Sequence, residues 1–183
     1  MEYPTVSIII PRRRDDSAEA AIEAVLQSDY PQDLLEIIEV LGENPSKQRN
    51  TGATVASGDI LYFLDNDSIV TPTLFSRVAK YYVDSLNVKD HESEAKRWET
   101  LAGVGGPNLT PQSDGFLQKI SGHALASPFA HFSMCARYTP TGTRRYAGEK
   151  ELILCNLSIH RETFLRENGF HEAMYPNEEN EFI

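Results

Sequence analysis

Two acidic residues, one residue apart, follow directly on an apolar run in the segment LYFLDNDSI (61–69). The carboxylates of Asp65 and Asp67 are oxygen ligands of the kind that Mg²⁺ or Mn²⁺ takes in proteins, commonly together with substrate phosphates. A metal held there would neutralise charge on a leaving diphosphate. Because Asp, Asn and Ser also favour turns, the same residues fit an ordinary turn that binds nothing.

A second acidic cluster lies near the end of the chain and contains Glu178, Glu179 and Glu181. If the fold brings one of these carboxylates into a cleft, it can act as a general base that accepts a proton from an attacking hydroxyl. The alternative is a solvated surface, which is the usual place for densely packed like charges.

Three arginines, 12–14, follow the first apolar run of a chain whose net charge is -10. Such a cluster in an acidic chain is suited to a phosphate group. The alternative is a solvated loop in which Asp15 and Asp16 balance the arginines.

In the first half of the chain, apolar runs typical of strands alternate with segments of helical pattern, which predicts a parallel sheet with helical crossovers. The apolar runs are continuous, as in strands that are covered on both faces. Ligands bind beyond the carboxyl ends of such strands, where Asp65, Asp67 and the arginines stand. Strands are expected at 5–11, 34–42 and 59–65, and helices at 16–29, 46–57 and 71–84. The expected helix caps are Asp16 or Ser17, Ser46, and Thr71 followed by Pro72.

The second half is less regular. Its patterns predict strands at 101–108 and 152–160, helices at 115–127 and 161–168, a long loop at 127–151, and a charged helix or loop at 84–100.

Length and composition favour a single domain of a globular protein, with 183 residues, 40% of them hydrophobic and 24% charged. The net charge of -10 argues against nucleic acid as the main partner. Cys135 and Cys155 lack the spacing of metal ligands and are expected to stay reduced in a cytoplasmic protein. No stretch reads as a signal peptide or reaches the roughly 18 apolar residues of a spanning helix. The chain is expected to be truncated at its C-terminal end.

Six segments together resemble the family 2 glycosyltransferases of the GT-A fold, and they stand in the family's order. They are VSIIIP, LEIIEVLG, KQRNTGATVASGDILYFLDND, GVGGPN, NLSIHRETFLRENGFHE and NEENEF. The stretch ASPFAHF, a later RY and NEENEF are most similar to bacterial exopolysaccharide transferases of the succinoglycan type.

The resemblance implies an α/β fold with a Rossmann-like, mostly parallel central sheet flanked by helices, and a smaller region on the acceptor side. Residues 1–108 would form the nucleotide-sugar-binding half of one domain, and residues 109–183 the acceptor-binding half. The implied reaction is an inverting transfer from a nucleotide-sugar, usually a UDP-sugar, to a hydroxyl of a glycan or lipid-linked acceptor in polysaccharide or glycoconjugate synthesis. Membrane association, at the cytoplasmic face, is expected through residues outside this sequence.

The resemblance also assigns roles to individual residues. Asp65 and Asp67 match the family's DxD motif, which contacts the ribose and the metal-bound diphosphate, with Asp67 as the direct Mg²⁺ or Mn²⁺ ligand. Glu179 matches the catalytic base, although Asp is commoner there, and Glu178 would place the acceptor. Arg49 would approach the base or diphosphate; the alternative is a helix residue that pairs with a surface acid.

The nucleotide side of the site departs from the family pattern. Relatives often carry an Asp pair after the second strand, one of which reads uracil, whereas this chain has Val-Leu-Gly-Glu at 40–43. Glu43 is the nearest acid and is the candidate to replace it. Pro11 and Arg12, at the end of the first strand, are expected to contact the nucleotide.

Two other functions fit the same residues. A phosphatase of the haloacid-dehalogenase type also ends an apolar strand in Asp-x-Asp. In that type the motif normally follows the first strand, and Thr or Val stands two residues after the second Asp, whereas in this chain the motif follows the third strand and Ser68-Ile69 come next. A nucleotide-sugar-binding module without activity would also explain the missing uracil-reading acid.

Overall fold

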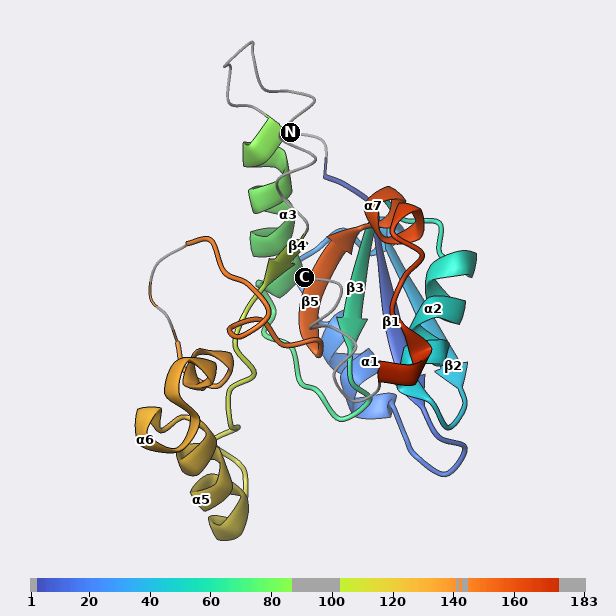
Figure 1. The fold of residues 1–183 in the computed structure, drawn as a ribbon. Helices are drawn as coiled ribbons and strands as arrows, with labels where there is room; N and C mark the ends of the chain where they lie inside the picture. The colour runs from blue at the N-terminus through green and yellow to red at the C-terminus, as the bar shows by residue number, and fades with distance from the viewer. Residues whose placement is uncertain (1–2, 87–102, 141, 143–144, 175–183) are drawn as a thin grey trace.

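The computed structural model describes residues 3–86, 103–140, 142 and 145–174. Within these residues one sheet of five strands lies at the centre, in the order β2-β1-β3-β5-β4 (Figure 1). Strand β1 pairs in parallel with β2 and β3, whereas β5 runs antiparallel to both β3 and β4. The strands are β1 Val6–Arg12, β2 Leu35–Leu41, β3 Ile60–Leu64, β4 Gly103–Gly105 and β5 Asn156–His160.

Helices cover both faces of the sheet, so the fold has three layers (Figure 1). One face carries α1 (Glu19–Leu26) and α3 (Leu74–Leu86), and the other carries α2 (Pro45–Val55) and α7 (Arg161–Arg166). Short 3-10 turns precede β2 and follow α7, at η1 (Gln32–Leu34) and η3 (Glu172–Met174). The predicted mostly parallel α/β sheet is therefore confirmed.

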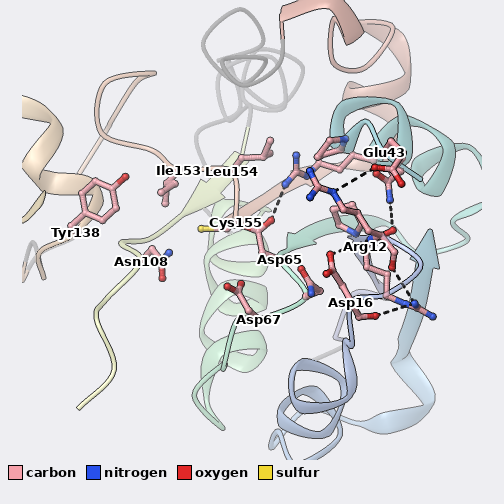
Figure 2. Close-up of a pocket in the computed structure, with 16 residues that line it drawn as sticks. Arg12, Asp16, Glu43, Asp65, Asp67, Asn108, Tyr138, Ile153, Leu154 and Cys155 are labelled. Atoms are coloured by element: carbon pink, nitrogen blue, oxygen red, sulfur yellow. Dashed lines mark hydrogen bonds and ion pairs between the residues drawn. The ribbon is translucent and has the colours of Figure 1, made fainter. Parts of the chain in front are cut away.

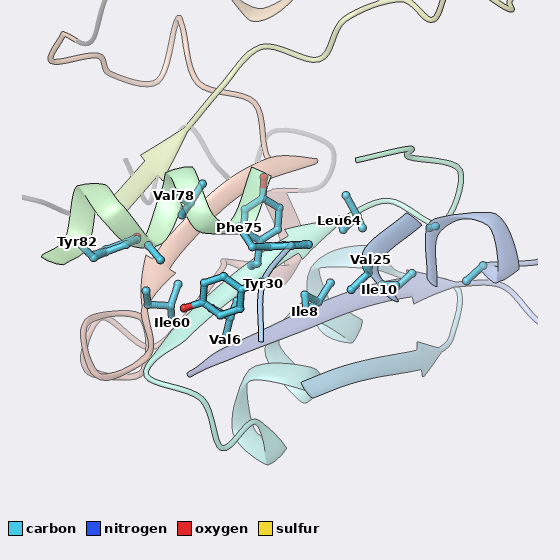
Figure 3. Packing of buried hydrophobic residues seen from close by; sticks show 14 residues of the cluster. Val6, Ile8, Ile10, Val25, Tyr30, Ile60, Leu64, Phe75, Val78 and Tyr82 are labelled. Carbon is cyan, nitrogen blue, oxygen red and sulfur yellow. The ribbon is translucent and has the colours of Figure 1, made fainter. Parts of the chain in front are cut away.

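The larger core lies between the sheet and helices α1 and α3. Figure 3 shows Phe75, Val78 and Tyr82 of α3 above the side chains of β1 and β3. The strands contribute Val6, Ile8, Ile10, Ile60, Tyr62 and Leu64, all of them buried. Burying large apolar side chains at this density is the main favourable term in folding, at roughly 1.5–3 kcal/mol for each one.

The second core lies on the opposite face, beneath α2 and α7. Phe63 of β3 packs against Phe164 and Phe170, with ring centroids 5.3 and 5.1 Å apart. Helix α2 approaches β1 closely because Gly52 faces Ile9, where an added Cβ would come within 2.6 Å of the Ile9 Cγ2 atom. A larger residue at position 52 would push α2 away from the sheet.

The edge strand β2 departs from the prediction of strands covered on both faces. Strands β1 and β3 are almost wholly buried, but β2 is only partly covered and exposes Glu39 and Leu41. An apolar run alone does not distinguish a central strand from an edge strand, because both bury at least one face.

Two predicted helix caps are wrong and one is shifted. Helix α2 is capped by the side chain of Asn44, which accepts a hydrogen bond from the Lys47 N–H at 3.0 Å, while Ser46 is buried. The hydroxyl of Ser17 accepts from the Glu19 N–H at 3.2 Å, but the helix itself starts one residue later than a Ser17 cap requires. Helix α3 begins only at Leu74, beyond the expected cap and Pro72.

The region expected as one long loop holds further helical turns. After α5 (Phe116–Leu125) come α6 (Pro128–His131) and the 3-10 turn η2 (Phe132–Arg137). Figure 1 shows α5 and α6 projecting away from the sheet. Among the helices described, not one combines the length and the hydropathy needed to cross a bilayer.

Candidate functional site

A pocket opens where the parallel strands β1 and β3 end (Figure 2). The chain leaves β1 for β2 on one side and returns to β3 on the other, and ligands of open α/β sheets bind at such a reversal. The pocket has a volume of about 430 Å³. Its lining residues are Pro11, Arg12, Arg13, Asp16, Glu43, Pro45, Gln48, Arg49, Asp65, Asn66, Asp67, Asn108, Tyr138, Ile153, Leu154 and Cys155.

The pocket brings together most of the site residues expected from the sequence. Those are Pro11, Arg12, Glu43, Arg49, Asp65 and Asp67, which come from segments far apart in the chain. Glu178 and Glu179 lie outside the described residues.

The two aspartates of the DND segment stand in different surroundings. Asp65 accepts a hydrogen bond from the Arg49 guanidinium, with 2.8 Å between Nη2 and Oδ1, and its carbonyl accepts from the Ser68 N–H, which forms the turn after β3. Asp67 is exposed in the pocket, and no residue that the structure describes donates a hydrogen bond to its carboxylate. The turn after β3 and the place in the pocket were expected as alternatives for these acids, but the structure has both, because the turn places Asp65 and Asp67 in the pocket lining.

Arg49 is nearly buried, with only 7% of its side chain exposed, whereas Asp65 is 40% exposed. A buried guanidinium requires a charged partner, since an unpaired charge inside a protein is costly. The expected alternative, that Arg49 pairs with an acid, therefore agrees with the ion pair that the structure contains. The acid, however, is the first aspartate of the pocket rather than one on a remote surface.

Two of the three arginines, Arg12 and Arg13, form ion pairs with acids of β2 and its following turn, and both also hydrogen-bond to Asp16 of their own loop. Arg12 Nε lies 2.5 Å from a carboxylate oxygen of Glu39, and Arg13 Nε lies 3.6 Å from one of Glu43. Both arginines line the pocket, and Arg14 does not. Their pairs leave the guanidinium groups at the rim, where a phosphate can compete for them.

Gln48 holds the ends of β1 and β2 together beneath this rim. Its side-chain amide donates to the carbonyl oxygens of Arg12, at 2.9 Å, and Val40, at 2.5 Å. It is almost fully buried, so this amide closes the pocket floor between α2 and the sheet. Sequence reasoning missed Gln48, although its place beside Arg49 in the QRN segment could have indicated it.

The far wall is built by the second half of the chain. Figure 2 shows Tyr138 and Asn108 at the opposite end of the pocket from Arg12. Asn108 follows β4, and Ile153, Leu154 and Cys155 precede β5. The strand-end rule could have found Asn108, whereas residues that precede an antiparallel strand give no such signal.

Cys155 is a wall residue and not a nucleophile. Burial and, second, the nearby charge of Asp65 raise the pKa of its thiol to about 12. The thiol therefore stays protonated at neutral pH, and its sulfur acts as a small apolar surface.

The segment that leads toward Glu178 and Glu179 is held against α2 by hydrogen bonds. Asn50 donates from its amide to the Phe170 carbonyl at 2.8 Å and accepts from the Phe170 N–H at 2.9 Å. Asn44 donates to the Glu172 carbonyl at 3.3 Å. Helix α2 thus holds Arg49 toward the pocket and, one residue later, holds this segment.

Potential metal ligands in the pocket are few. The described residues contain no group of three or more His, Cys, Asp or Glu side chains arranged to hold an ion. The Asp65 and Asp67 pair suffices only for an ion that takes its other ligands from substrate and water, which is the usual way that Mg²⁺ is bound.

Comparison with known proteins agrees with this fold. The sequence pattern described as "Glycosyl transferase family 2" matches residues 8–90, which include α2, β3 and both aspartates. No curated protein matches the chain.

Among solved structures, similar folds are found in TarS of S. aureus (TM-score 0.58, 12% identity, 97% of this chain and 32% of that one) and in TarS 1-349 in complex with UDP (0.55, 11%, 97% and 53%). A third is the mannosyltransferase PcManGT of Pyrobaculum calidifontis in complex with GDP-Man and Mn²⁺ (0.55, 15%, 99% and 51%). This chain spans about a third to a half of the length of these proteins. Residues 8–90 therefore carry the sequence pattern of glycosyl transferase family 2, within a chain that has the GT-A fold.

Proposed function

We propose that this protein is a glycosyltransferase that moves a sugar from a nucleotide-sugar to an acceptor hydroxyl. The observation that carries the proposal is one pocket at the switch point of the sheet, which gathers Arg12, Arg13, Asp65 and Asp67. The match of residues 8–90 to glycosyl transferase family 2 supports the same reaction class.

The donor occupies the end of the pocket formed by β1, α2 and β3. Cationic Arg12 and Arg13 suit the diphosphate, and the rim between Pro11 and Glu43 suits the base. A UDP-sugar is the proposed donor because TarS is known in complexes with UDP and UDP-GlcNAc, although PcManGT is known with GDP-Man. Glu43 takes the place of the usual uracil-reading acid in this assignment.

Asp65 and Asp67 would hold a divalent ion, Mg²⁺ or Mn²⁺, together with the diphosphate. The chemistry that such an ion supplies is neutralisation of charge on the leaving group. Asp67 contributes the exposed carboxylate, while Arg49 fixes the orientation of Asp65. The complex of PcManGT with Mn²⁺ and GDP-Man is consistent with a metal at this place.

The transfer itself is proposed to invert the anomeric centre. Glu179 accepts the proton of the acceptor hydroxyl, whose oxygen forms a bond to the anomeric carbon. The bond from that carbon to the diphosphate oxygen breaks, and the nucleoside diphosphate leaves with the electron pair. Glu178 helps to place the acceptor. Both roles rest on the family resemblance of the NEENEF segment.

The acceptor side is assigned to residues 109–183, and the donor side to residues 1–108. Tyr138 and Ile153, from the second part, complete the wall opposite the arginines, where an acceptor would enter. The succinoglycan-type resemblance points to a glycan or lipid-linked acceptor in exopolysaccharide synthesis, in the cytoplasm or at the inner membrane surface.

Calorimetric titration with UDP tests the donor site. UDP is expected to bind the parent protein at least about tenfold more tightly with Mn²⁺ than without, and Asp67→Ala is expected to lose that difference. Asp33→Asn, an exposed acid on η1, serves as the control and should behave as the parent. Equal UDP affinity in all cases would show that Asp67 has no metal role.

Turnover tests the reaction class and the base separately. Glu179→Gln is expected to bind the donor as the parent does but to lose transfer; unchanged turnover would exclude Glu179 as the base. Metal-dependent donor binding without transfer to any acceptor, in the parent, would instead identify a binding module. Hydrolysis of a phosphate ester without a sugar acceptor would identify a phosphatase.

A further inference from the structure

The unit formed by α5, α6 and η2 exposes large apolar side chains that the rest of the fold does not cover. Helix α5 packs on α6, and α6 on η2, so the three elements form one projecting body (Figure 1). Its exposed apolar side chains, together named the exposed apolar face, are Phe116, Leu117, Ile120, Phe129 and Phe132, which are 79, 77, 50, 96 and 78% exposed. Side chains of this kind gathered on one element mark a contact surface.

Helix α5 is turned outward compared with an ordinary helix of a globular protein. At 100° per residue, Phe116, Leu117, Ile120 and Ala124 share one arc, which is exposed to solvent. The opposite side carries Gly122, which is buried against Thr110 of its own chain. A soluble domain normally places these faces the other way round, with the apolar arc toward the core.

The charge of this part of the chain is opposite to that of the remainder. No Asp or Glu occurs between residues 115 and 148, whereas a chain with 27 acids in 183 residues would place about five there. The same stretch contains Lys119, Arg137, Arg144 and Arg145. Of those that the structure describes, Arg137 is buried and Arg145 pairs with Glu151, whereas Lys119 is exposed. Lys119 flanks the apolar arc of α5, one turn after Phe116.

The projecting body is attached at the rim of the pocket. It begins after Asn108 and ends before Tyr138, and both residues line the pocket wall. The Asn108 N–H donates to the Arg137 carbonyl at 2.8 Å, which holds the two ends of the body together. The body is therefore attached at the side of the pocket that Asn108 and Tyr138 line.

We propose that the exposed apolar face docks on the surface of a lipid bilayer that contains anionic lipids. The phenylalanines and leucine enter the boundary between headgroups and acyl chains, and Lys119 meets the headgroup phosphates. The remaining described surface carries acidic residues, which the same bilayer repels. The protein therefore docks with the body formed by α5, α6 and η2 against the membrane and with the pocket rim near it.

Charge favours a membrane over a second copy of the chain. Two copies that met through this face would place two Lys119 flanks close together, and like charges oppose such a contact. An anionic lipid surface pairs with those flanks and also accepts phenylalanine without a complementary protein groove.

Flotation of the whole 183-residue protein with vesicles tests the proposal. The parent is expected to float with vesicles of phosphatidylcholine and phosphatidylglycerol, and less with phosphatidylcholine alone. Leu117→Asp is expected to weaken binding by at least about tenfold, because it places a carboxylate in the interface. Lys119→Gln should weaken binding to the anionic vesicles only, and added salt should do the same.

The matched control is Leu26→Asp, an exposed leucine on helix α1 that is 56% exposed. It should float as the parent does, and circular dichroism should show all variants folded. Absence of flotation by the parent, or equal flotation by Leu117→Asp, overturns the proposal. A dimer in light scattering that Leu117→Asp converts to a monomer, without vesicle binding, assigns the face to self-association instead.

Discussion

Arg49 of α2 and Asp65 after β3 form a hydrogen-bonded ion pair across the floor of the pocket, with the arginine almost buried and the aspartate half-exposed. The pair joins a helix to a strand end, and it turns one oxygen of Asp65 toward the protein. The proposed donor site and its structural support therefore share one contact.

Arg49→Met is expected to weaken UDP binding in the presence of Mn²⁺ by about tenfold, or about 1.4 kcal/mol. Loss of the guanidinium frees Asp65 to rotate and leaves its carboxylate without this partner. Calorimetry measures the effect. Arg166→Met is the matched control, because that arginine pairs with Glu167 at the surface and should leave affinity unchanged.

Asn50→Ala is expected to lower kcat by about tenfold or more while UDP affinity stays within about twofold. Asn50 makes both hydrogen bonds to the Phe170 backbone, and removing this partly buried amide partner costs roughly 1 kcal/mol. Steady-state kinetics and UDP titration separate the two quantities. Thr54→Ala, exposed on the same helix, is the control, and an equal loss of UDP affinity would contradict a role confined to the acceptor side.

The two cysteines are expected to differ in reactivity. With a thiol pKa of about 12, Cys155 is about one part in ten thousand thiolate at pH 8. Ellman's reagent should therefore modify Cys135, which is only partly buried, at least about tenfold faster in the folded protein. Cys135→Ser and Cys155→Ser report each thiol alone, and in denaturant both should react alike. Equal rates in the native state would exclude the buried thiol described for the pocket wall.

Glu36 gives stability a dependence on pH. Burial alone would raise its pKa, but hydrogen bonds from the Ser57 N–H, at 2.8 Å, and the Ser7 hydroxyl lower it below the ordinary 4.5. A lowered folded-state pKa stabilises the fold above the unfolded value, and the gain is lost as pH falls through the folded value.

Glu36→Gln is therefore expected to be less stable than the parent by about 1 kcal/mol at pH 7, with the gap closing as the pH falls below about 4. Urea unfolding at several pH values measures it. Glu167→Gln, at an exposed pair, should show little change at any of them. A gap that does not narrow at all as the pH falls below 4.5 would mean that the glutamate acts through packing rather than charge.

The first half of the fold was accessible from the sequence because its signals are local. Continuous apolar runs gave β1 and β3, and the residue types after them placed Arg12 and Asp65 at one edge. The helix starts were less accessible: Asn44 caps α2 because the following proline can occupy the first helical position, which the choice of Ser46 overlooked.

The second half depended on tertiary contacts that no local pattern encodes. The run before His160 predicts a strand, but its antiparallel direction follows only from pairing with β3 and β4. Cys155 and Leu154 reach the pocket through that direction, and Gln48 through its contacts with two carbonyls. Cys155 and Leu154 could not have been assigned to the site beforehand, whereas Gln48 could have been indicated only by its place beside Arg49.

Because β5 runs antiparallel to β3, the strands of the sheet and the connection that forms the far wall of the pocket are separate parts of the structure. Since β5 enters the sheet from the pocket edge, its preceding residues form the wall, and the chain between Tyr138 and Ile153 can change in length without altering a strand register. Loops tolerate insertion far better than sheets do. In the proposed function, a new acceptor is thus accommodated by a change in the length of this one connection, while the end of the pocket built from β1, α2 and β3 stays fixed.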